Sequence, residues 1–182
     1  MNNHPLSIVI FGASGDLTKR KLVPALYNLY QKDRLPEIKI IGTSRSEYSH
    51  NQFRQHLLEG IHNFSPETFD QKSWEEFSSN IQYQQGDLTS VEDYQKLSDT
   101  LNELEGQETN RLYYLAISPE FYHQTIQNMG IAGLAKQQTE KDAPWTHIII
   151  EKPYGIDLDT ARELNKTVHK VFSEDQVYRI DH

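Results

Sequence analysis

A glycine-bearing turn follows the first apolar segment of the chain. The run Gly12-Ala13-Ser14-Gly15-Asp16-Leu17 lies between a strand-like segment and a helical one. Glycines let the backbone turn tightly and approach a pyrophosphate, and the unpaired N–H groups of the next helix attract its charge. This order of strand, glycines and helix predicts a dinucleotide site with G-x-x-G spacing. A P-loop is excluded because no Gly-Lys-Ser/Thr ending is present.

A hydroxyl and a guanidinium follow the second strand-like segment. Ser44 and Arg45 occupy the place where an NAD site usually has Asp or Glu for the ribose hydroxyls. A carboxylate would repel a 2′-phosphate, whereas an arginine suits a phosphate well. These two residues therefore favour NADP as the cofactor.

Residues suited to ligand contact also follow the later segments. Asp87 and Leu88 offer a hydrogen bond and an apolar contact to an adenine, although a simple turn explains them equally well. The small residues of 116–119 would let the backbone approach a dinucleotide. After the isoleucines 148–150 comes Lys152, which could meet a phosphate or a sugar hydroxyl, and Pro153, a candidate for a cis peptide bond.

The elements that must position these residues follow from hydrophobic periodicity. Helical spacing of apolar residues separates short β-branched or aromatic runs. We expect strands at 6–11, 38–41, 81–84, 111–117, 147–150 and 177–180. Alternating strands and helices imply an α/β fold, because parallel strands need crossovers. We therefore predict a Rossmann-like, doubly wound, mainly parallel six-stranded sheet with ligands beyond the carboxyl ends of its strands.

Several residues predict where helices begin, bend or end. Pro24 should kink the first helical stretch or end its first segment. Ser65-Pro66 has the form of a cap and first helical residue, Ser90 to Asp93 has the form of a capping box, and Asp157 is expected to cap the last helix. The polar segment 133–144 is expected to be a loop.

Composition narrows the class of protein. The net charge of −8 disfavours nucleic acid as a partner. The chain has no cysteine, which excludes disulfides and cysteine metal sites, and we expect no metal. We find neither a signal peptide nor an apolar run near the ~20 residues needed to cross a bilayer. The expectation is a cytoplasmic protein without a membrane partner.

Three motifs together resemble glucose-6-phosphate dehydrogenases. The run 11–22, FGASGDLTKRKL, is similar to the family's opening motif, and Glu151-Lys152-Pro153-Tyr154-Gly155 is similar to its second. Arg179-Ile180-Asp181-His182 resembles the first half of its active-site signature. The motifs occur in the family's order and at about its spacing, and the likeness covers the whole chain.

The resemblance implies an NADP-dependent dehydrogenase that oxidises carbon 1 of glucose 6-phosphate to a lactone, the first step of the oxidative pentose phosphate pathway. It implies that 12–17 bind the pyrophosphate, with Gly12, Ser14, Gly15, Asp16 and Leu17 as the contacting residues. Ser44 and Arg45 would hold the 2′-phosphate, and Asp87 and Leu88 would line the adenine side. By the same resemblance, Lys21 and Lys152 would lie where cofactor and sugar meet, Lys152 and His182 would contact the substrate, and Asp181 would orient a catalytic histidine.

That catalytic histidine belongs, in the family, to a second domain that also supplies most sugar contacts and the subunit interface. We therefore expect 1–182 to be one NADP-binding Rossmann domain, with the substrate and dimerisation domain absent from this chain. The fragment is expected to be inactive alone, and the full-length protein to be a homodimer or homotetramer.

Two other classes of protein remain open at this point. A non-catalytic NADP-sensing Rossmann protein related to atypical short-chain reductases would share the Gly-Ala-Ser-Gly turn. The catalytic short-chain reductases are disfavoured, because no tyrosine here has a lysine four residues later. A structural or partner-binding module of the same fold is the second alternative, since fold alone does not give function.

Overall fold

A single parallel sheet organises the chain, seen in a computed structural model that describes residues 4–105, 108–138, 140, 142–155 and 157–181. Its strands are β1 (Leu6–Phe11), β2 (Ile38–Ser44), β3 (Ile81–Gln85), β4 (Asn110–Leu115), β5 (Thr146–Glu151) and β6 (Val177–Ile180). The strand order is β3-β2-β1-β4-β5-β6, and each neighbouring pair is parallel. The predicted Rossmann-like α/β fold is confirmed.

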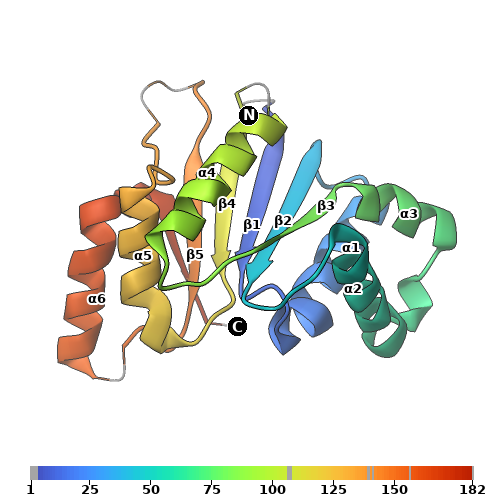
Figure 1. Cartoon of the computed structure of the whole chain (residues 1–182), viewed down its shortest axis with the longest axis horizontal. Coiled ribbons are helices and arrows are strands. Elements are labelled where there is room, and N and C mark those ends of the chain that lie inside the picture. Colours follow the sequence, from blue (N-terminus) through green and yellow to red (C-terminus); the bar gives the residue numbers. More distant parts are fainter. Residues whose placement is uncertain (1–3, 106–107, 139, 141, 156, 182) are drawn as a thin grey trace.

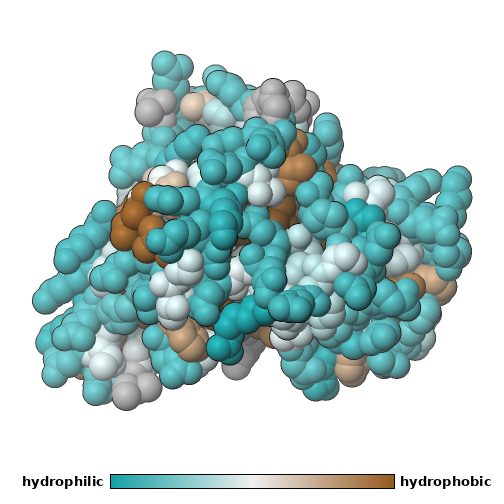
Figure 2. Space-filling view, in the orientation of Figure 1, coloured by the Kyte–Doolittle hydropathy of each residue, from teal (hydrophilic) through white to brown (hydrophobic). Residues whose placement is uncertain are grey.

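Helices cover both faces of the sheet (Figure 1). They are α1 (Val23–Gln31), α2 (His50–Phe64), α3 (Gln71–Ser79), α4 (Val91–Glu105), α5 (Tyr122–Ile131) and α6 (Leu158–Val171). Along β1, Ile8 and Ile10 join a core with α1 to α3, whereas Val9 and Phe11 join a core with α4 to α6. This alternation is the period of two of a strand buried on both faces. On the face that carries α4, apolar residues reach the surface only in small separate patches (Figure 2).

Register brings the predicted ligand-binding residues to one edge. Phe11, the last residue of β1, is opposite Thr43 of β2 and Leu115 of β4. The residues that follow β1, β2 and β4 therefore lie together at the carboxyl ends of the strands, where ligands bind in folds of this kind.

The helical stretch after the glycine turn differs from a simple α-helix. Residues Thr18–Leu22 form a π-helical turn, and α1 begins at Val23 with Pro24 in its first turn. The expected change of segment at Pro24 is confirmed. Helical structure runs without a break from Asp16 into α1, so Pro24, which has no N–H to donate, lies where the π-helical hydrogen-bond pattern changes to the α-helical one.

One predicted helix start is wrong, and a second is right except that its capping box is incomplete, since α4 begins at Val91 directly after Ser90. Ser65-Pro66 opens only the 3₁₀ turn Pro66–Thr68, and the side chain of Asp70 caps α3 by accepting from Ser73 N–H at 2.8 Å. Ser90 does accept from Asp93 N–H at 3.3 Å, but the Asp93 carboxylate accepts from Asp87 N–H at 3.0 Å rather than completing a capping box.

The remaining local predictions agree with the structure apart from strand ends. Asp157 caps α6 through a 2.8 Å bond from Thr160 N–H. The described residues between α5 and β5 form neither helix nor strand beyond Ile131, as expected of a loop. Strand β4 ends at Leu115, two residues before the expected end at Ile117, because 116–118 turn away into the 3₁₀ turn Pro119–Phe121.

Candidate cofactor site

A hollow of about 330 Å³ lies at the carboxyl ends of β1, β2 and β4. The carboxyl ends of four strands and the turns that follow them supply its lining, because Leu88 after β3 joins the residues at the ends of β1, β2 and β4. The described lining residues are Gly12, Ser14, Gly15, Ser44, Arg45, Ser46, Leu88, Ala116, Ile117, Ser118 and Phe121. Six residues singled out from the sequence as a cofactor site therefore meet here: Gly12, Ser14, Gly15, Ser44, Arg45 and Leu88.

Gly12 shapes the turn through its conformation. Its φ of +79° lies in the left-handed region, where residues with a Cβ are strained. The N–H groups of Gly12 and Ala13 both donate to Thr43 O, at 2.9 and 3.1 Å, so they tie the turn to β2. Helical structure begins by Asp16, and the first N–H groups of a helix have no earlier carbonyl to bond. Donors for an anion are thus expected from the helix start rather than from Gly12.

Three serine hydroxyls gather beside Arg45. Ser44 Oγ and Ser46 Oγ both donate to Ser14 Oγ, at 2.9 and 3.1 Å. This links the glycine turn to the end of β2, and the exposed Arg45 side chain lies between the two donors in sequence. A guanidinium with several hydroxyls is a suitable donor set for a phosphate. Ser46 was not predicted, although its position two residues after Ser44 is a signal that it shares the same side of an extended segment.

Asp87 lies next to the hollow, and Leu88 lines it. The Asp87 carboxylate accepts from both the N–H and the hydroxyl of Thr89, each at 2.8 Å. These bonds from Thr89, with a smaller contribution from the Arg45 charge, lower the pKa of Asp87 below its ordinary value. Asp87 is therefore held as an ionised acceptor beside the predicted adenine region.

Besides Asp87 and Lys152, three predicted cofactor residues do not appear among the described lining. Asp16 is exposed and bonds Arg20 Nη1 at 2.9 Å, one turn later in the same segment. Leu17 is half-buried just before the π-helical turn, and Lys21 is exposed within it. Their assigned roles remain predictions.

Lys152 and Asp181 pair with one another at the ends of β5 and β6. Lys152 Nζ lies 2.8 Å from the Asp181 carboxylate, and both side chains are exposed. The Lys152–Pro153 peptide bond is cis, as the sequence suggested. The preceding Glu151 is anchored twice: its carboxylate accepts from the Tyr114 hydroxyl, and its carbonyl accepts from the Tyr122 hydroxyl at 3.2 Å. His182 lies outside the described residues.

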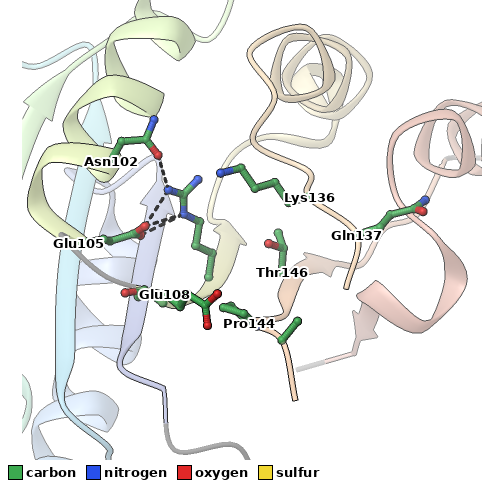
Figure 3. A pocket seen from close by; sticks show the side chains of 10 residues that line it. Asn102, Glu105, Glu108, Lys136, Gln137, Pro144 and Thr146 are labelled. Carbon is green, nitrogen blue, oxygen red and sulfur yellow. Dashed lines mark hydrogen bonds and ion pairs between the residues drawn. The ribbon is translucent and has the colours of Figure 1, made fainter. Parts of the chain in front are cut away.

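A larger hollow, of about 440 Å³, lies at the opposite edge of the sheet (Figure 3). It is lined by Arg111 and Thr146 at the amino ends of β4 and β5, and the Lys136 side chain points across it. The guanidinium bonded to Asn102 and Glu105 in that view belongs to Arg111. The one guanidinium nitrogen without a partner among the described residues is sealed from solvent. This hollow is therefore not the candidate cofactor site, because it is at the wrong end of the strands.

The described residues contain neither a metal-binding cluster nor a membrane-spanning helix. Within the described residues, no three or more His, Asp or Glu side chains are grouped so that they could hold a metal ion. In the same residues, no helix has the length and apolar character needed to cross a membrane.

Comparison with known proteins identifies the family. Residues 9–182 match the family model "Glucose-6-phosphate dehydrogenase, NAD binding domain". The chain is 38% identical over 182 residues to glucose-6-phosphate 1-dehydrogenase of Chlamydia pneumoniae, covering 98% of this chain and 36% of that enzyme. It is 42% identical over 179 residues to the enzyme of Aggregatibacter actinomycetemcomitans, covering 96% of this chain and 35% of the relative.

Solved structures agree. A glucose-6-phosphate dehydrogenase in complex with its substrate glucose-6-phosphate superposes with a TM-score of 0.85 at 34% identity, covering 99% of this chain and 37% of that one. An archaeal alcohol dehydrogenase from Thermococcus sibiricus, complexed with 5-hydroxy-NADP, has a TM-score of 0.54 at 12% identity, a likeness of fold alone. The chain spans about 36% of the length of the first relatives. This chain belongs to the glucose-6-phosphate dehydrogenase family and corresponds to its NAD-binding domain.

Proposed function

We propose that this chain binds NADP and serves as the cofactor domain of a glucose-6-phosphate dehydrogenase. The observation that carries the proposal is Arg45, with the hydroxyls of Ser44 and Ser46 beside it, at the end of β2. A cofactor with a 2′-phosphate needs this donor set, and an unphosphorylated ribose would favour a carboxylate there. The turn at Gly12 to Leu17 would hold the pyrophosphate, and Asp87 with Leu88 would lie at the adenine.

Bound NADP would accept a hydride from carbon 1 of glucose 6-phosphate, which leaves a lactone. In this proposal Lys21 and Lys152 lie where cofactor and sugar meet, Lys152 and His182 contact the substrate, and Asp181 orients a histidine base supplied from outside residues 1–182. Lys152 Nζ lies 2.8 Å from the Asp181 carboxylate, which supports assigning both side chains to one site. The anchoring of Glu151 by Tyr114 and Tyr122 supports a fixed backbone just before Lys152.

The proposal places the full-length enzyme at the first step of the oxidative pentose phosphate pathway, in the cytoplasm, as a homodimer or homotetramer. The non-catalytic sensor is disfavoured, because the likeness to NADP-binding reductases is one of fold alone. Membership of the dehydrogenase family, by contrast, extends over residues 9–182.

Replacing Arg45 tests the cofactor assignment. Arg45→Ala should weaken NADP binding by roughly 10- to 100-fold, because a charge-assisted pair to the 2′-phosphate is lost. NAD has no such group, so its affinity should change by less than about threefold. Isothermal titration calorimetry of both cofactors at one salt concentration measures the two losses.

The matched control is Arg162→Ala, which removes another exposed arginine, in α6 and outside the lining of the hollow. It should leave both affinities unchanged. Equal losses of NADP and NAD affinity in Arg45→Ala would reject the assignment of Arg45 to the 2′-phosphate.

A further inference from the structure

The hydroxyl of Tyr83 lies beneath the turn that carries Arg45. Tyr83 belongs to β3 and is 5% exposed. Its oxygen is 2.9 Å from Ser44 O and 2.5 Å from Ser46 O, so its single proton is shared between two carbonyls. Those carbonyls belong to the residues on either side of Arg45. The Tyr83 hydroxyl therefore anchors the backbone on both sides of Arg45.

The Tyr83 ring is itself held in place. The ring centroid is 4.7 Å from that of Phe53 and 5.5 Å from that of Tyr48. The backbone N–H of Tyr83 donates to His50 Nδ1 at 3.0 Å. A Cβ on Gly42 would come within 2.5 Å of the Phe53 ring, so glycine there makes room for this packing. Buried side chains of this kind have little freedom to shift. The position of the hydroxyl is therefore fixed by the core.

A chain of hydroxyls connects Tyr83 to the hollow. Ser44 Oγ is 2.8 Å from the Tyr83 oxygen and also bonds Ser14 Oγ, to which Ser46 Oγ donates. Tyr83, Ser44, Ser14 and Ser46 therefore form one connected set of hydroxyls, and Ser14 at its end lines the hollow. Tyr83 thus orders the serines as well as the backbone beside Arg45.

We propose that Tyr83 is a positioning residue for the 2′-phosphate subsite and sets the preference for NADP over NAD. The inference rests on the proposed function of this hollow. Without the Tyr83 hydroxyl, the turn at 44–46 loses its fixed anchor, and Arg45 and the three serines must be ordered when the phosphate binds. Preorganised groups bind more tightly because that ordering cost has already been met by folding. Burial raises the pKa of Tyr83, so the hydroxyl remains a donor across the neutral range.

The test is Tyr83→Phe, which keeps the ring and its packing and removes only the hydroxyl. NADP affinity should fall by roughly 10-fold, and NAD affinity by less than about threefold, so the NADP-to-NAD ratio should fall. Calorimetric titration of the 182-residue chain with each cofactor measures the ratio, and circular dichroism checks that the variant is folded. A merely structural tyrosine would lower both affinities together or neither.

The control is Tyr27→Phe, which removes another buried hydroxyl that donates to a backbone carbonyl, that of Asp70 at 3.0 Å. Tyr27 lies in α1 and packs on Trp74 and Phe77, away from the hollow, so its loss should leave the ratio unchanged. If the unaltered chain prefers NADP and Tyr83→Phe keeps that preference in full, the role of Tyr83 is overturned while the proposed function stands. If the unaltered chain shows no preference for NADP, the proposed function fails and this inference with it.

Discussion

Replacing Gly12 by alanine is expected to lower the free energy of unfolding by about 3 kcal/mol, through left-handed strain and steric overlap together. The φ of Gly12 is +79°. A Cβ there would lie 2.2 Å from Ala116 O and 2.9 Å from Ala116 C. Both are backbone atoms of the residue that directly follows β4, so neither can rotate out of the way. The glycine turn or the end of β4 must move, and both line the cofactor hollow.

Chemical denaturation followed by circular dichroism at 25 °C measures this loss, and Gly133→Ala separates its two causes. Gly133 also has a left-handed φ, of +68°, but a Cβ there meets nothing within 4 Å. Its replacement should therefore cost only the conformational strain, about 1 kcal/mol. If both variants lose the same stability, the close approach to Ala116 does not explain why glycine is needed at position 12.

Gly12→Ala should also abolish measurable binding of NADP, because the glycine turn, Arg45 and the serines line the same hollow. Thermal shift with added NADP should stabilise the Gly133→Ala variant and leave Gly12→Ala unaffected. A normal NADP-induced shift in Gly12→Ala would show that the turn can move without disturbing the site.

Local signals predicted the sheet and half of the site. The apolar run 6–11 forms β1, because a strand buried on both faces needs apolar residues throughout. Gly12 forms the turn after it, because its left-handed φ disfavours residues with a Cβ. Ser44 and Arg45 can be predicted because the carboxyl ends of parallel strands face the ligand in this class of fold. In each case the residue type and its place in the strand order carry the information.

Long-range contacts decided what the sequence could not predict. Ser65 and Asp70 both have the type of a helix cap, and the Tyr27 hydroxyl, which bonds the backbone of Asp70, helps to fix where α3 begins. The bond between Lys152 and Asp181 joins residues that are 29 positions apart, and that between Tyr83 and Ser44 joins residues 39 apart. No local pattern specifies such pairs, because they form only when separate strands reach the same edge.

A buried ion pair lies beside the hollow of about 440 Å³ at the amino ends of β4 and β5. Breaking this pair is expected to lower the free energy of unfolding strongly. Arg111 and Glu105 have side chains that are 4% and 7% exposed, and Arg111 Nη2 lies 2.7 Å from the Glu105 carboxylate. Arg111 Nε also contacts both carboxylate oxygens, at 3.0 and 3.1 Å, and Asn102 accepts from Nη2 at 2.9 Å. Burial has the largest single effect and lowers the pKa of the Arg111 guanidinium, but the interactions with Glu105 and Tyr113 together outweigh burial and raise that pKa. The guanidinium is therefore charged, and it ties the last turn of α4 to β4.

Glu105→Gln should lower the free energy of unfolding by about 3–5 kcal/mol, because it leaves a buried positive charge without its counterion while conserving side-chain volume. Chemical denaturation again measures the loss. Glu59→Gln is the matched control: Glu59 pairs with Lys19 at 2.9 Å but is 55% exposed, so its loss should cost under about 1 kcal/mol. The double variant Glu105→Leu with Arg111→Met removes both charges and should recover most of the stability, since apolar replacements of buried pairs are often nearly neutral. If the double variant is as unstable as Glu105→Gln, the cost lies in lost packing and not in an unpaired charge.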